Sequence, residues 1–413
     1  MAHYVMLTQV YPPDPAAPGQ HFESAALRLA SRGHRLTVYT SDRDSSDSSI
    51  RLNGSSRHPG VRVVRLPWSN FGIRSQFLRH LSQMVYLGQV FFRLLIKGGV
   101  DGVILTTNPP TVGMMYLVLR AFRRFPTLYW VMDVNPDRSI AMGHRGEDSP
   151  MVVLLDWCNG RIYRICETVV VLDRYMRQRI LRKNFLRDEE CGKVEIIPPW
   201  PLEKELRPVP REENTFLTAH NLENKRCIFM YSGNHSLVHP LGTLLSAIRA
   251  RKNREDLSFL FVGGGEAKGG VESFIEEQRP SNVRSFPYQP LETLSFSLSA
   301  ADVQIVVMGD PMVGIVHPCK IYGAMAVGKP VLYIGPLKSH LGELVSLCGF
   351  GWVVDHGEVE RLEALIDEIA AMPREEREAM GARGRELIGK SYSAEILAGR
   401  FCELVEGLRT PRT

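Results

Sequence analysis

Short apolar segments alternate with amphipathic segments along almost the whole chain, and this alternation restricts the possible folds more than any other feature. Apolar runs of strand length begin near residues 3, 34, 61, 100, 127, 167 and 193, and again near residues 226, 257, 283, 302, 329 and 351. Most of them are followed by a segment with helical periodicity, which is typical of parallel sheets with crossover helices. The sequence therefore predicts an α/β fold.

The alternation is interrupted once, by a segment rich in proline and charge at residues 198–214. A chain of 413 residues is too long for one typical core, so this segment is interpreted as a linker between two domains. We predict two Rossmann-like, doubly wound domains that face each other across a cleft. Residues 1–200 would form the first domain and residues 201–391 the second.

Charge is unevenly distributed. Between residues 48 and 132 there are eleven Lys and Arg residues and one acid, Asp101, although the net charge of the whole chain is only +5. This excess predicts an anionic partner for the first domain. Residues 74–97 read as a long helix with Arg74, Arg79, Arg93 and Lys97 beside aromatic residues. That helix would either dock on an anionic membrane or be a core helix with a basic outer face.

The cysteines and the first residues bear on the cellular location of the protein. The seven cysteines are scattered without a CxxC pair, and the first residues lack the basic and apolar regions of a signal peptide. The protein is therefore expected in the cytoplasm, with peripheral attachment to the inner face of the membrane as an open alternative. Nucleic acid is not expected as a partner, because the basic half contains no recognition module.

The candidate site residues follow the strands, because ligands of doubly wound sheets bind beyond the carboxyl ends of the strands. In the second domain these residues are Gly233, Asn234 and His235, then Gly263, Gly264 and Gly265, then Tyr288 and Gln289, and finally Pro318, Cys319 and Lys320. Glycine-rich turns with free amides and one lysine suit a diphosphate. Taken singly, the glycines could be tight turns and the lysine a solvated surface residue.

The first domain offers a loop after its first strand that contains Gly19 and Gln20, where glycine would let the backbone approach a phosphate closely. A flexible surface loop is the alternative. Asp42-Arg43-Asp44 has the DxD form of metal-dependent transferases, but its Ser- and Asp-rich context favours a solvated loop. We expect no metal site and no cofactor.

Together these segments resemble the retaining family-four glycosyltransferases of polysaccharide and O-antigen synthesis, whose architecture is the two-lobed GT-B fold. The resemblance rests on PPDPAAPGQHF, DVNPD, YSGN, FVGGG, SAADVQIVVM and PCKIYGAMAVGKPVL, and is strongest between residues 227 and 336. It implies transfer of a sugar from a nucleotide-diphosphate donor, UDP being favoured, to a glycan or lipid-linked acceptor. It also implies that residues 392–413 pack back onto the first domain.

The resemblance assigns roles by position. Lys320 and the amides near Pro318 and Cys319 would hold the diphosphate, with Gly19 and Gln20 closing over the β-phosphate. Tyr288 and Gln289 would border the base. Asp133 would lie at the sugar–acceptor junction and, with Lys320, is the predicted catalytic pair; Tyr322 is assigned to the donor site.

Four positions depart from the family pattern. Gly323 and Ile315 stand where members usually carry glutamate, and Asn234 and His239 align roughly with the Arg and Lys that usually grip the phosphates. Two alternatives therefore stay open. One is a non-catalytic scaffold of a glycan-synthesis complex, and the other is a nucleotide-sugar epimerase.

Overall fold

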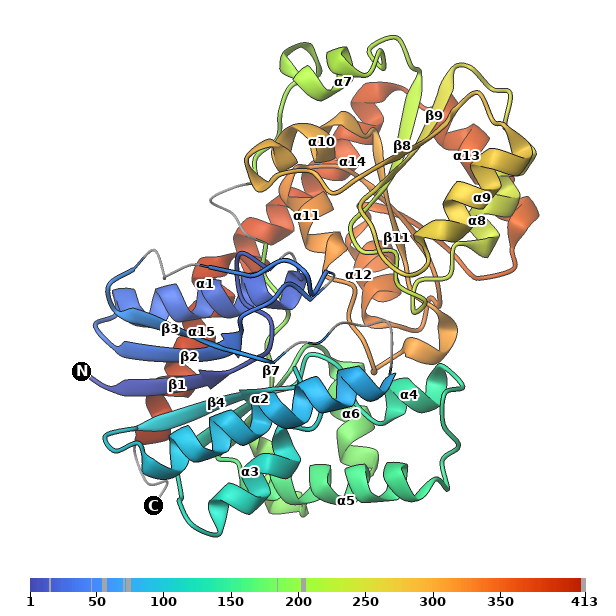
Figure 1. Cartoon of the computed structure of the whole chain (residues 1–413). Coiled ribbons are helices and arrows are strands. Elements are labelled where there is room, and N and C mark those ends of the chain that lie inside the picture. The colour runs from blue at the N-terminus through green and yellow to red at the C-terminus, as the bar shows by residue number, and fades with distance from the viewer. Residues whose placement is uncertain are drawn as a thin grey trace. The chain divides into compact units, whose positions relative to one another are not determined.

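A computed structural model describes residues 1–14, 16–45, 47–53, 58–69, 71, 76–183, 185–201 and 206–409. The chain divides into two compact units (Figure 1). The first unit comprises Met1–Pro199, Gly314–His317 and Glu395–Thr413, and the second comprises Trp200–Val313 and Pro318–Ala394. The sequence boundaries had not placed Gly314–His317 with the first unit.

A seven-stranded parallel sheet forms the centre of the first unit within the described residues, in the order β3-β2-β1-β4-β5-β6-β7. Its strands are β1 (His3–Leu7), β2 (Arg35–Ser41), β3 (Val61–Leu66), β4 (Gly102–Thr106), β5 (Thr127–Trp130), β6 (Thr168–Val171) and β7 (Val194–Ile196). The strand order reverses direction between β1 and β4, which makes this the switch point beyond which ligands bind in such sheets.

The helices of the first unit are α1 (Ala17–Ser31), α2 (Gln76–Ile96), α3 (Val112–Arg120), α4 (Asp137–Ala141), α5 (Pro150–Ile165), α6 (Arg174–Arg182) and α15 (Ala394–Glu406), whose first residue still belongs to the second unit. The expected helix at residues 74–97 is thus α2; residues 74 and 75 lie outside the described residues. Within those residues, no helix is both long and apolar enough to cross a bilayer.

The last helix, α15, is red in Figure 1 and packs in the first unit. Phe401 of α15 is fully buried, and its ring centroid lies 4.3 Å from that of Trp130 in β5. Phe22 of α1 meets the same indole edge-on at 5.2 Å. Arg32 and His34 both contact Glu406, at 3.1 and 3.0 Å. Residues 410–413 lie outside the described residues.

A six-stranded parallel sheet forms the centre of the second unit within the described residues, in the order β10-β9-β8-β11-β12-β13. Its strands are β8 (Cys227–Ser232), β9 (Leu257–Val262), β10 (Val283–Phe286), β11 (Val303–Val307), β12 (Val331–Ile334) and β13 (Gly351–Val354). Its helices are α7 (Thr215–Ala219), α8 (Gly242–Arg249), α9 (Lys268–Gln278), α10 (Leu294–Ala300), α11 (Lys320–Ala326), α12 (His340–Cys348), α13 (Val359–Ala371) and α14 (Arg374–Leu387). The predicted fold class, α/β with two Rossmann-like domains, is confirmed.

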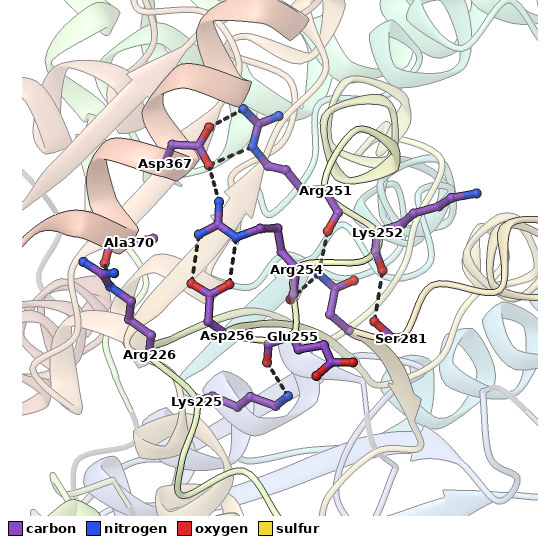
Figure 2. Close-up of polar contacts among 11 residues, drawn as sticks. Lys225, Arg226, Arg251, Lys252, Arg254, Glu255, Asp256, Ser281, Asp367 and Ala370 are labelled. Carbon is purple, nitrogen blue, oxygen red and sulfur yellow. Dashed lines mark hydrogen bonds and ion pairs between the residues drawn. The ribbon is translucent and has the colours of Figure 1, made fainter.

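An ion-pair network joins α13 to the turn after α8 (Figure 2). Arg251 donates two hydrogen bonds to the carboxylate of Asp367, at 3.1 and 2.5 Å, and also contacts Glu363 at 3.0 Å. Arg254 donates at 3.2 Å to Asp367 Oδ1, which also accepts from Arg251 Nε, and it forms a bidentate pair with Asp256. These hydrogen bonds, above all those from Arg251, lower the pKa of Asp367.

We expect Asp367→Asn to lower the free energy of unfolding by about 1 kcal/mol at pH 7, because Asp367 is partly exposed and solvent screens the pair. The pKa of Asp367 is lower in the folded state than in the unfolded chain. The contribution of ionised Asp367 to the free energy of unfolding is therefore complete at pH values above its pKa in the unfolded chain, about 4, and is lost as the pH falls through its pKa in the folded state. Thermal unfolding of parent and variant between pH 7 and pH 3 measures this difference.

Glu255→Gln is the matched control, since Glu255 lies in the same turn and its side chain is exposed. It should change stability little at any pH. A difference between the parent and Asp367→Asn that does not shrink toward pH 3 would contradict the stabilising role of the charge.

Candidate active site

A cavity of about 310 Å³ lies in the first unit beyond the ends of β1, β4 and β5. Most of the residues that line it are polar, among them Gln9, Arg43, Thr107, Asn108, Asp133 and Arg138. These residues leave the sheet around its switch point, where a doubly wound sheet is expected to bind a ligand. The lining supplies amide, hydroxyl, carboxylate and guanidinium groups, which together can hydrogen-bond a polyhydroxylated ligand.

Asp133 is held in this cavity by the loop that follows β5. The hydroxyl of Thr107 accepts hydrogen bonds from the amides of Met132 and Asp133, at 3.0 and 3.3 Å. Arg138 donates to the Asp133 carboxylate at 2.8 Å. Burial raises the pKa of Asp133, and the neighbouring Arg138 opposes that increase. The carboxylate is thus fixed in position and faces the cavity of its own unit.

Gly19 and Gln20 do not lie in a loop, as the sequence had suggested. They belong to the first turns of α1, because Pro18 suits the start of a helix and its missing N–H costs nothing there. A Cβ on Gly19 would come within 3.3 Å of the Tyr11 backbone, so glycine permits close packing of α1 on the preceding segment. The described lining of the cavity includes Pro18 but neither of these two residues.

The glycine-rich turns of the second unit lie side by side because of the strand register. Ser232 of β8 pairs with Val262 of β9, so Gly233 and Gly263 leave the sheet at the same level. A Cβ on Gly263 would lie 2.1 Å from the carbonyl oxygen of Gly233, and a Cβ on Gly265 would lie 2.1 Å from the Asn234 side chain. Both glycines have positive φ, +120° and +128°. No other residue fits this backbone-to-backbone contact.

Lys320 reaches this pair of turns from the start of α11. Its ammonium donates to the Tyr231 hydroxyl and to the Asn234 carbonyl oxygen, the latter at 2.7 Å, and lies 3.8 Å from the centroid of the Tyr231 ring. Its stem lies against Gly233, where a Cβ would approach the lysine Cε to 3.0 Å. Burial lowers the pKa of Lys320 well below its ordinary value. In the part of the chain that the structure describes, no carboxylate pairs with this lysine.

His235 bonds to the backbone of both glycine-rich turns. It is buried, its amide donates to the Gly264 carbonyl at 2.7 Å, and its Nδ1 lies 3.0 Å from the Gly233 carbonyl. Burial lowers the pKa of His235 to about 4. The imidazole thus contacts the first turn and the His235 amide contacts the second, and together they fix the conformation of both turns. His239, four residues later, is also buried.

The remaining predicted residues of the second unit fall into two groups. Tyr288 is about half exposed and lies on the Gly264 backbone, to whose carbonyl its hydroxyl donates at 3.2 Å; Gln289 beside it bonds locally to Pro287. Cys319 directly precedes α11 and Pro318 is buried beside it. Tyr322 points into the interior, with its ring 5.6 Å from that of Tyr392. The turns, Tyr288 and Lys320 therefore come together, whereas the Tyr322 ring lies in the core.

The chain matches known families over both units. The glycosyl transferase 4-like domain family matches residues 17–200, and the glycosyl transferases group 1 family matches residues 212–387. A glycosyltransferase of Pseudomonas aeruginosa, WbjE, is 30% identical over 308 residues, which cover 75% of each chain. The chain belongs to the glycosyltransferases.

Other relatives and solved structures agree with this assignment. A colanic acid biosynthesis glycosyl transferase of Escherichia coli, WcaI, is 26% identical over 45% of each chain. Sucrose-phosphate synthase of Thermosynechococcus elongatus has the same fold, with a TM-score of 0.78, 19% identity and 99% of each chain covered. Anabaena HepE, solved with UDP and glucose, covers 98% of this chain and 100% of its own with a TM-score of 0.73 and 12% identity. The fold of this glycosyltransferase is therefore GT-B.

Two of the departures from the family pattern have a visible environment in this glycosyltransferase. Ile315 is buried, and its carbonyl accepts a hydrogen bond from the Val134 amide at 2.9 Å within the first unit. Gly323 is half-buried, and a Cβ there would meet only Leu298 and Leu206, at 3.7 and 4.0 Å. A side chain at position 323 therefore has room but apolar neighbours.

Sequence reasoning missed two cationic residues of these sites. Arg138 fixes Asp133, and its place five residues after the loop aspartate could have suggested an ion pair. Lys268 is buried below the glycine turns and donates to the carbonyls of Phe261 and Phe286, at 2.9 and 3.0 Å. Burial lowers the pKa of Lys268, and nothing in the local sequence distinguishes it from a solvated lysine.

The DxD segment belongs to a loop that is held by its own polar contacts. Asp42 lies 3.7 Å from Arg51, and the side chain of Asp44 accepts from the Asp47 amide at 3.1 Å, which are the contacts of a structured loop. In the described ranges, no group of three His, Cys, Asp or Glu side chains could hold a metal ion.

Proposed function

We propose that this glycosyltransferase transfers a sugar from a UDP-sugar, with retention of anomeric configuration, to a glycan or lipid-linked acceptor in the synthesis of envelope or exported polysaccharide. The observation that carries the donor half is Lys320, a half-buried cation that pairs with no carboxylate among the described residues and lies beside two turns of bare backbone. A buried charge of this kind is costly unless a ligand compensates it. A diphosphate supplies that compensation.

In this proposal the two units take separate tasks. The turns at Gly233 and Gly263 and the Lys320 ammonium bind the donor diphosphate, and Tyr288 borders the base. As the sugar–phosphate bond breaks, negative charge accumulates on the leaving diphosphate, and Lys320 stabilises it where water is excluded. The cavity that contains Asp133 receives the acceptor, whose hydroxyl loses its proton to the departing phosphate on the same face of the sugar.

The name of WcaI, which refers to colanic acid biosynthesis, supports the polysaccharide assignment. The structure of HepE, which was solved with UDP and glucose, supports a UDP-sugar donor. The proposal needs no metal ion, because a protein cation neutralises the leaving group. Activity should therefore survive EDTA. A cytoplasmic location is part of the proposal and agrees with seven free cysteines in the described structure.

The direct test incubates the purified protein with UDP-, GDP- and ADP-sugars, first alone and then with extracted membranes. A donor at a hundred times its dissociation constant should stabilise the protein by about 2.7 kcal/mol. Sugar transfer to extracted acceptors with retained configuration supports the proposal. Conversion of the donor without any acceptor would show an epimerase, and stabilisation without turnover under any condition would show a scaffold.

Gly323 decides how the ribose is bound. The family glutamate at this position would accept hydrogen bonds from the ribose hydroxyls, and its absence predicts weak donor affinity with KM raised more than kcat is lowered. We expect Gly323→Glu to tighten UDP binding severalfold, because a Cβ fits there without a close contact. Calorimetry of parent and variant measures the change, and Gly323→Gln controls for charge. Weaker binding by both variants would mean that Leu206 and Leu298 already shape this space.

A further inference from the structure

The outer surface of α2 carries an apolar stripe. Leu81, Met84, Phe92 and Ile96 are all exposed, and Ile96 is 82% exposed. They are spaced by three, eight and four residues, so they lie on one side of the helix. Tyr86, Val90 and Leu94 are buried on the opposite side. A basic outer face was one of the two alternatives from the sequence. Of the cations described there, Arg93 is half-buried and Lys97 reaches inward to Thr37 at 3.2 Å.

The stripe continues across the two neighbouring helices. α3 packs against both α2 and α5, and Figure 1 shows the three helices along one side of the first unit. Phe91 of α2 meets Phe122, just after α3, with ring centroids 6.2 Å apart. The exposed apolar residues that extend the stripe are Val118, Phe122, Met151, Val153, Leu154 and Trp157. We name this surface, from Leu81 to Trp157, the α2–α3–α5 face.

Exposed arginines border this face. Arg124 follows α3, and Arg161 and Arg164 continue the exposed side of α5 from Trp157. The Arg161 guanidinium lies 5.1 Å from the centroid of the Trp157 ring. The described residues of α2 and α3 include no acid, and the one acid of α5, Asp156, pairs with Lys183 at 2.8 Å.

We propose that the α2–α3–α5 face docks on a bilayer surface that contains anionic lipid. Large contiguous apolar patches are rare on free surfaces, and they mark interaction sites. Aromatic and aliphatic side chains can enter the boundary between headgroups and acyl chains, while arginines at the border contact lipid phosphates. A second copy of the chain fits less well, because a two-fold contact would bring like-charged arginines together. This inference does not depend on the donor or acceptor proposed above.

The test is co-sedimentation of the full-length protein with vesicles. We expect binding to vesicles of phosphatidylcholine with phosphatidylglycerol, weaker binding at high salt, and little binding to phosphatidylcholine alone. Phe92→Ser with Trp157→Ser should reduce the partition coefficient at least about tenfold, since each buried aromatic contributes strongly to interfacial binding. Arg124→Glu with Arg161→Glu should reduce it by a similar factor, because each basic residue near the surface contributes about fivefold.

Matched controls come from the second unit. Leu347 is 84% exposed and Arg249 is exposed, so Leu347→Ser and Arg249→Glu change the same kinds of groups elsewhere and should leave binding unaltered. Unchanged thermal unfolding verifies that each variant is folded. Equal vesicle binding by the parent and both face variants would overturn the proposal. So would a parent that forms dimers, binds no vesicles and becomes monomeric in the Phe92→Ser, Trp157→Ser variant.

Discussion

Lys320→Ala should weaken UDP binding at least about tenfold and leave the melting temperature of the free protein nearly unchanged. A charge-assisted hydrogen bond to a phosphate contributes about 1.5–3 kcal/mol, which the variant loses. The free protein loses little, because its lysine is desolvated and donates only to the Tyr231 hydroxyl and the Asn234 carbonyl. Isothermal calorimetry with UDP and thermal unfolding without ligand measure the two quantities.

Two further variants isolate the charge. Lys320→Met retains a stem that can pack against Gly233 and should lose as much affinity as the alanine variant. Lys338 is exposed on the same unit, and Lys338→Ala should bind UDP as the parent does. Equal UDP affinity in Lys320→Met and the parent would refute contact between the ammonium and the phosphates.

The lowered pKa of Lys320 adds a pH signature to the same interaction. A bound diphosphate favours the charged ammonium, so binding raises the pKa of Lys320 from its lowered free-state value. Between the free and bound values, binding must take up a proton, and affinity must fall as pH rises. Calorimetry in buffers of different ionisation enthalpy detects this uptake. Lys320→Met should abolish it.

The sequence predicted the fold class and the family because the relevant signals are local. Apolar runs such as the one at β9, all of whose residues are buried, read directly as strands of a parallel sheet. The glycine turns and Lys320 were also found locally, because each follows a strand or begins a helix. Their neighbours in space then follow from topology, since parallel strands bring their carboxyl ends to one edge of the sheet.

What the sequence could not show depends on side-chain direction and on contacts between distant segments. Gly19 was expected in a loop, and only the packing of α1 on Tyr11 shows why it is glycine. Lys268 was missed because its burial depends on carbonyls at the ends of β9 and β10. Gly314–His317 lies in the first unit, where the Ile315 carbonyl accepts a hydrogen bond from the amide of Val134, 181 residues earlier in sequence. No local sequence pattern indicates a contact over this separation.

Gly263→Ala should be the most destabilising of the glycine substitutions at the turns that we propose bind the donor. Two effects add. Alanine at a φ of +120° is strained by about 1–3 kcal/mol, and its Cβ would lie 2.1 Å from the Gly233 carbonyl oxygen, so backbone must move. Forcing atoms into a packed site costs about 1–3 kcal/mol more. A loss of about 2–6 kcal/mol corresponds to a melting temperature lower by roughly 4–24 °C, at about 2–4 °C per kcal/mol.

Gly269→Ala is the control, because it replaces a nearby glycine at a site without backbone strain or crowding. Gly269 lies six residues later in α9, has no atom within 4 Å of a Cβ, and has an ordinary helical φ. Alanine there should stabilise the protein by up to about 1 kcal/mol, since it favours the helix. Opposite signs for the two variants are expected in thermal unfolding. A Gly263→Ala melting temperature within 2 °C of the parent, a threshold of about the size of 1 kcal/mol, would mean that the turns at Gly233 and Gly263 are not in contact and that the donor site is built differently.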